Sequence, residues 1–140
     1  MPEKAERTVL AFDFGIKRIG VAVGEPELGT AHPLPGIVAS LARARFEAIG
    51  RLIREWHPGA LVVGLPLGED GNPHDTTRRA QRFARQLQGR FGLPVRLVDE
   101  RFSSAEAESL LRGRRVARHV IDSVAAQRIL EQYFDERAAA

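Results

Sequence analysis

A continuous apolar run, Ala60-Leu61-Val62-Val63-Gly64-Leu65, constrains the fold of this chain more than any other feature. A strand without polar alternation is buried on both faces, which is typical of a central strand in a parallel sheet. Segments with helical spacing of apolar residues stand on either side of it, at 41–56 and 75–91. Parallel strands need such crossover connections, so the pattern predicts a βαβαβ unit whose last strand is 95–99.

The residues before this unit predict antiparallel strands. Strands at 8–14 and 18–24 flank a short turn and form a hairpin, and prolines bound a weaker edge strand at 31–39. Beyond the last strand we expect one helix that begins at Ser103 and a final helix from about residue 121 to residue 134. The predicted fold class is α/β: a mixed five-stranded sheet flanked by helices, with the first three strands antiparallel and the last two parallel.

Length and composition predict one soluble domain. A chain of 140 residues can bury a single core, so we expect one domain over 1–140 whose ends, 1–7 and 136–140, are frayed. The absence of cysteine excludes disulfides and thiolate metal sites. The charged first ten residues lack the apolar core of a signal peptide, and no apolar stretch is long enough to span a bilayer. We therefore expect a cytoplasmic protein that does not bind membranes.

Three acidic positions lie in apolar surroundings, where carboxylates are not expected. Asp13 follows a strand-like run, Asp99-Glu100 follows another, and Asp122 interrupts the apolar start of the last helix. A carboxylate in an apolar environment is costly unless it is paired, protonated or bound to a metal. Because parallel strands end at the same edge of a sheet, the acids after the first and last strands should meet there. We therefore predict a divalent-cation site, which points to phosphodiester chemistry.

Each acid also has a purely structural interpretation. Asp122 shares a helical face with Ala125 and Ile129, but aspartate is also favoured as a helix N-cap. Asp13 could simply open a turn. Asp99 and Glu100 could equally be an exposed strand end with Arg101 as a surface partner. Adjacent strand residues point to opposite faces, so only one of Asp99 and Glu100 can face a site; Glu100 is our choice, and the pattern leaves Asp99 open.

Basic residues are placed unevenly, although the net charge is only +3. Between residues 76 and 98 the chain has six arginines and no acid, and a second cluster precedes Asp122. Arginine suits bidentate phosphate contacts, so the pattern favours a nucleic-acid partner; arginines on helices are also often merely solvated. The candidates for phosphate contacts are three arginines of the predicted helix 75–91 and the basic pair at the hairpin tip. These residues are Arg78, Arg82, Arg85, Lys17 and Arg18.

Four ordered motifs resemble the YqgF family of pre-16S rRNA nucleases, which are also described as Holliday junction resolvase-like. The resemblance covers roughly residues 8 to 134. Its motifs are Leu10-Ala11-Phe12-Asp13-Phe14-Gly15-Ile16-Lys17-Arg18-Ile19-Gly20-Val21-Ala22-Val23, Val62-Val63-Gly64-Leu65-Pro66 with Asp70-Gly71, Asp99-Glu100-Arg101, and Ile121-Asp122-Ser123-Val124-Ala125-Ala126.

The resemblance implies a ribonuclease H-like fold and a catalytic trio of Asp13, Glu100 and Asp122, which selects Glu100 over Asp99. It implies that the trio binds Mg²⁺ or Mn²⁺, in a mechanism with two ions about 4 Å apart. It also implies that Arg101 and Ser103, like the hairpin-tip residues, support the site or contact phosphates.

The function that the resemblance implies is endonucleolytic processing of the 16S rRNA precursor at its 5′ end, with structured RNA and ribosomal precursor particles as partners. The alternative with the same chemistry is resolution of branched DNA, which requires a two-fold homodimer rather than a monomer. More remote alternatives are a non-catalytic RNA-binding domain and, from the Asp13-Phe14-Gly15 string, one half of an actin-like ATPase.

Overall fold

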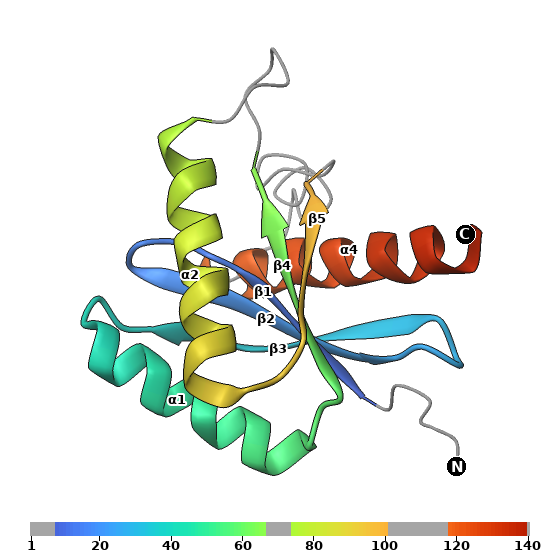
Figure 1. Ribbon diagram of the computed structural model, residues 1–140, viewed down its shortest axis with the longest axis horizontal. Coiled ribbons are helices and arrows are strands. Elements are labelled where there is room, and N and C mark those ends of the chain that lie inside the picture. The colour runs from blue at the N-terminus through green and yellow to red at the C-terminus, as the bar shows by residue number, and fades with distance from the viewer. Residues whose placement is uncertain (1–7, 67–73, 101–117, 140) are drawn as a thin grey trace.

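The computed structural model describes residues 8–66, 74–100 and 118–139, with the backbone alone described for 118–122 and 139 (Figure 1). Its sheet has the strand order β3-β2-β1-β4-β5. β2 is antiparallel to β1 and to β3, whereas β1, β4 and β5 run parallel. The predicted mixed sheet is therefore confirmed. The strands are β1 (Val9–Asp13), β2 (Arg18–Glu25), β3 (Thr30–Val38), β4 (Ala60–Leu65) and β5 (Val95–Asp99).

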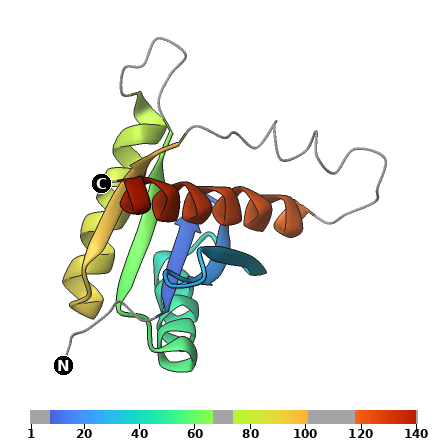
Figure 2. The same ribbon diagram turned by 90° about the vertical axis from the view of Figure 1, so that its right-hand side faces the viewer.

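Helices cover both faces of this sheet (Figures 1 and 2). α1 (Ala42–Trp56) and α2 (Asp75–Phe91) pack on one face, where Phe46 and Phe83 join the larger apolar core. α4 (Arg118–Ala139) crosses the other face and buries its own apolar side chains there. No helix within the described residues is long and apolar enough to cross a membrane.

Alternation along β1 decides which face each side chain meets. Leu10 and Phe12 lie in the core beneath α1 and α2, whereas Val9 and Ala11 lie in the core beneath α4. Because successive strand residues point to opposite faces, Asp13 continues the series that faces α4. The last residue of β1 thus presents its carboxylate on the α4 side of the sheet.

A β-bulge interrupts the pairing of β2 with β3. Ile19 is opposite Ile37 and Val21 is opposite Leu34, so β3 spends three steps where β2 spends two. The extra residue bends β3 locally, as bulges do. Pro35 and Gly36 lie at this point, and both residue types are typical of bulges, although the sequence analysis did not predict one.

The largest departure from the predicted helix boundaries is at the end of the chain; α1 begins at Ala42, one residue later than predicted. β4, α2 and β5 span the predicted residues, whereas α4 begins at Arg118 rather than at 121 and continues to Ala139 rather than ending at 134. Residues 136–139, predicted to be frayed, are helical. Gln132 donates a hydrogen bond to Glu136, and Arg137 donates one to Tyr133; both bonds span one helical turn and support the end of the helix. The helix expected to begin at Ser103 lies outside the described residues.

Candidate functional site

Asp13 and Glu100 meet at the carboxyl edge of the parallel strands. β1 ends at Asp13 and β5 ends at Asp99. β4 lies between these two strands and pairs in parallel with both. The Glu100 N–H donates to the carbonyl of Leu65 at 2.8 Å, so the ladder extends one residue past β5. Glu100 therefore lies two residues after buried Val98, on the face that α4 covers.

Gly64 makes room for the Glu100 carboxylate. A Cβ atom on Gly64 would lie 3.0 Å from Glu100 Oε2 and 2.5 Å from Cδ1 of Ile129 in α4. The strand is buried throughout, so a side chain at this position would displace the Ile129 side chain and crowd the Glu100 carboxylate. Sequence reasoning missed this role, although a glycine inside an apolar strand is the usual sign of a close approach.

Burial makes the charged form of Glu100 costly. Loss of solvation raises the pKa of the Glu100 carboxyl to about 7, and a hydrogen bond with the Asp13 side chain acts in the opposite direction. Glu100 Oε2 is buried and has no hydrogen-bond partner among the described residues. Two carboxylates this close share a proton or need a cation between them.

Asp99 stands apart from this pair. Its side chain is exposed, and its carbonyl oxygen accepts a hydrogen bond of 2.8 Å from Nε2 of Gln132, which ties α4 to the end of β5. The choice of Glu100 over Asp99 thus agrees with the way the two side chains are placed.

Residue 122 lies in the second turn of α4, which begins at Arg118. The N-cap interpretation of Asp122 is therefore wrong, because a cap precedes the first helical residue. One turn further on, Ala126 is completely buried against the sheet. The Asp122 side chain itself lies outside the described part of the structure, as do Arg101 and Ser103.

The described part of the site fits a hard divalent cation. Among side chains that the structure describes, no three histidine or acidic residues form a cluster that could hold a metal ion. Two carboxylates do converge, however, and one of them has a buried oxygen without a partner in that part of the chain. Oxygen donors of this kind suit Mg²⁺ and Mn²⁺.

The turn after Asp13 is held by α1 and α2. Arg45 Nη1 donates to the carbonyl of Ile16 at 3.1 Å, and its guanidinium carbon lies 5.3 Å from the centroid of the Phe14 ring. Phe14 also stacks on Phe83 of α2 at a centroid distance of 4.7 Å. Sequence reasoning did not select Arg45, because only the fold shows that a helical arginine reaches this turn.

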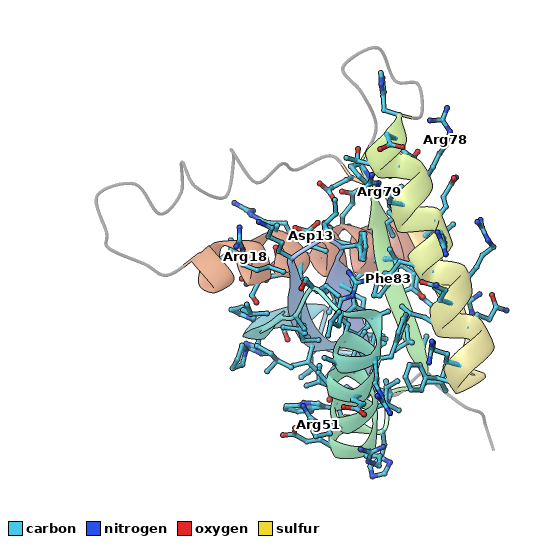
Figure 3. The ribbon with its side chains drawn as sticks, turned by 90° about the vertical axis from the view of Figure 1, so that its left-hand side faces the viewer. Asp13, Arg18, Arg51, Arg78, Arg79 and Phe83 are labelled. Atoms are coloured by element: carbon cyan, nitrogen blue, oxygen red, sulfur yellow. The ribbon has the colours of Figure 1, made fainter. Side chains whose placement is uncertain are left out.

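The two basic candidates at the hairpin tip lie near the carboxylates. Lys17 is exposed and Arg18 is half-buried. Arg18 opens β2 at the end where Gly20 pairs with Asp13, and Figure 3 shows this end of the hairpin. These positions are compatible with contacts to a phosphate that approaches the carboxylates.

The arginines of α2 lie on the layer opposite α4. Arg78, Arg82 and Arg85 are all exposed, but only Arg78 is in the first turn, at the carboxyl edge (Figure 3). Arg85 lines a shallow groove of 220 Å³ between α2 and β5, more than two turns into the helix. The structure therefore does not gather these arginines with the carboxylates.

Comparison with known proteins places the chain among nucleases and resolvases. Residues 7–136 match the profile of the RuvX family, described as Holliday junction resolvase. A relative from Methylobacillus flagellatus, named "Putative pre-16S rRNA nuclease", is 53% identical over 99% of this chain and 100% of its own length. A relative of the same name from Burkholderia pseudomallei is 57% identical over 93% of this chain and 89% of its own.

Solved structures with the same arrangement are distant in sequence. Thermus thermophilus RuvC matches with a TM-score of 0.55 at 18% identity, covering 94% of this chain and 96% of that one. Fowlpox virus resolvase, in complex with Holliday junction DNA, matches with a TM-score of 0.57 at 11% identity, covering 93% and 98%. The arrangement is that of the ribonuclease H-like fold.

Proposed function

This chain belongs to the RuvX family, and we propose that it is a single-domain, metal-dependent endonuclease that processes the 5′ end of the 16S rRNA precursor. Its relatives at more than half identity carry the name of a pre-16S rRNA nuclease, in agreement with the family resemblance of the sequence motifs. The observation that carries the proposal is the pairing of Asp13 with Glu100 over Gly64.

The proposed catalytic trio is Asp13, Glu100 and Asp122, which would hold Mg²⁺ or Mn²⁺ through carboxylate oxygens. When bound, a pair of such ions supplies an activated water for in-line attack and stabilises the departing oxygen. Glu100 must lose its proton to serve as a ligand, and the cation's charge favours that loss. The buried setting of Glu100 keeps its carboxylate poorly solvated, so little water has to be displaced from it.

The cations around this edge would orient the substrate. Arg18 lies two residues before Gly20, the partner of Asp13, and Lys17 precedes it, so we assign both of them contacts to the phosphates that flank the scissile bond. Arg101 and Ser103, one and three residues after Glu100 in the sequence, take the same role in the proposal. Arg78, Arg82 and Arg85 would then contact a more distant part of a structured RNA.

Resolution of branched DNA is the second candidate, and two observations favour it. The family description is that of a Holliday junction resolvase, and a virus resolvase bound to such a junction has the same fold. The same carboxylates would act in both reactions. Symmetric resolution needs two active sites, so this candidate requires a two-fold homodimer, whereas RNA processing does not.

Cleavage of two labelled substrates tests the proposal. Precursor 16S rRNA and a four-way DNA junction are incubated separately with the protein and Mn²⁺ or Mg²⁺, and Asp122→Asn serves as the inactive reference. Cutting of the RNA that is lost in the variant supports the proposal. Cutting of the junction alone moves the function to resolution, and cutting of neither substrate with full RNA binding would indicate a binding domain.

A further inference from the structure

Ser123 sits completely buried between α4 and the β2–β3 pair, one residue after Asp122. Its hydroxyl donates to the carbonyl of Leu34 in β3 at 2.5 Å and accepts the N–H of Val21 in β2 at 3.3 Å. Val21 and Leu34 are the pair at which the bulge shifts the register. A helix side chain thus bridges two strands at their one irregular point.

The position of this bridge relates α4 to the carboxylates. Val21 follows Gly20, and Gly20 is the β2 partner of Asp13. Val21 itself pairs with Phe12, so the Ser123 hydroxyl holds the second turn of α4 one residue from the end of β1. Both hydrogen-bond partners of the buried Ser123 hydroxyl are backbone groups of the strands. These bonds define the position of the helix, because any shift of the helix would leave a buried polar group without a partner.

A second hydrogen bond of the same kind lies one turn further along α4. Gln127 Nε2 donates to the carbonyl of Ala31 in β3 at 3.1 Å. Ala31 pairs with Gly24, which pairs with Val9 at the start of β1, four residues before Asp13. This contact joins the same helix to the same strand, but at the end of the sheet remote from the carboxylates.

We infer that Ser123 is a positioning residue: its hydroxyl holds the α4 backbone so that Asp122 completes the cation site with Asp13 and Glu100. The inference rests on the proposed function, because it takes Asp122 as the third ligand. It adds that the β2–β3 bulge is part of the site's construction. Removal of the hydroxyl weakens metal binding, while loss of the Gln127 contact does not.

Mn²⁺ binding to the full chain, followed by electron paramagnetic resonance of the free ion, tests this inference without any need for turnover. We expect Ser123→Ala to weaken Mn²⁺ binding about tenfold, which is the change in affinity that corresponds to the free energy of one hydrogen bond. Ser123→Thr keeps the hydroxyl and should bind Mn²⁺ as the unaltered protein does. Gln127→Ala, the matched control, should lose thermal stability but keep its Mn²⁺ affinity.

Two further variants keep the outcomes separate. Ser123→Cys keeps most of the side-chain volume but is a poor hydrogen-bonding group, so it tests the same loss if the alanine variant does not fold. Equal Mn²⁺ affinities for Ser123→Ala or Ser123→Cys and Gln127→Ala would overturn the inference. Glu100→Gln reports on the proposed function: if it leaves Mn²⁺ binding unchanged, the cation site itself is wrong, whatever Ser123 does.

Discussion

Glu100 Oε2 lies 3.0 Å from the place that a Cβ atom on Gly64 would occupy. The carboxylate thus uses space that only a glycine in β4 leaves open. The same missing side chain leaves room for Ile129 of α4, whose Cδ1 lies 2.5 Å from that place. One position in the sheet therefore governs both the seat of the acid and the approach of the helix.

Gly64→Ala should lower the free energy of unfolding by about 1–3 kcal/mol, because its methyl group overpacks a site without free space. It should also weaken Mn²⁺ binding, since Glu100 must move. Gly89 in α2 provides the control: a Cβ there meets nothing within 4 Å, so Gly89→Ala should stabilise the protein by about 0.5–1 kcal/mol. Urea unfolding and Mn²⁺ titration measure both effects. Unchanged metal binding in Gly64→Ala would separate Gly64 from the site.

Burial of Glu100 should make the metal-free protein less stable as the pH rises from about 4.5 to about 7. The folded protein keeps the Glu100 proton up to about pH 7, whereas the unfolded chain releases it near 4.5, so the folded state binds more protons in this window. The stabilisation present below pH 4.5, on the order of 3 kcal/mol, is therefore lost by pH 8.

Glu100→Gln removes this proton and keeps the shape of the side chain. Its unfolding free energy, measured in EDTA, should exceed that of the unaltered protein at pH 8 and vary less between pH 5 and pH 8. If Glu100→Gln were less stable than the unaltered protein at pH 8, the buried carboxylate would carry its charge at no cost. That result would contradict the raised pKa of Glu100.

Arg45→Ala should loosen the turn that follows Asp13. The variant loses the hydrogen bond to Ile16 and the contact with the Phe14 ring, so we expect a loss of about 1–2 kcal/mol in unfolding free energy. We also expect slower cleavage, since the turn carries Lys17. Arg51 is exposed on the same helix (Figure 3), and Arg51→Ala should stay within about 0.5 kcal/mol. Similar losses in the two variants, by thermal unfolding, would contradict the role of Arg45.

The fold could be predicted largely because its strands and breakers are local signals. The apolar run of β4 and the Gly92–Pro94 break before β5 mark their bounds in the sequence itself. The prediction of the last helix depended on the spacing of apolar residues. That spacing does not extend to the polar ends of α4, so the predicted helix was too short. The β2–β3 bulge lies at Pro35-Gly36, a local signal, but its contact with Ser123 joins residues 89 positions apart and no local pattern indicates that contact.

The candidate site could be predicted only in part, for the same reason. Strand alternation places Asp13 and Glu100 on one face, and the sequence shows this pattern directly. The roles of Gly64 and Arg45 depend on contacts between elements that are distant in the chain. The sequence pattern could not show on which face of the sheet the α2 arginines lie, and the helix packs on the face opposite α4.

Replacement of the three α2 arginines should flatten the salt dependence of RNA binding if that helix contacts the substrate. Each phosphate contact contributes roughly 0.7–0.9 to the slope of log affinity against log salt concentration, so the slope should fall by roughly 2–3. An unchanged slope would remove α2 from the binding surface. The tested set is Arg78, Arg82 and Arg85, all to alanine, and the control set is three exposed arginines of α1, namely Arg43, Arg51 and Arg54.

The most direct test of the carboxylate site compares two neighbouring acids in single-turnover cleavage of precursor 16S rRNA with Mn²⁺. Loss of a residue that only supports a metal ligand typically costs roughly 10- to 100-fold in activity. Glu100→Gln should slow cleavage by more than this, with RNA affinity unchanged. Asp99→Asn, an exposed acid one residue earlier, should cleave at the unaltered rate. Equal rates for the two variants, or a larger loss in Asp99→Asn, would contradict a site built on Asp13 and Glu100.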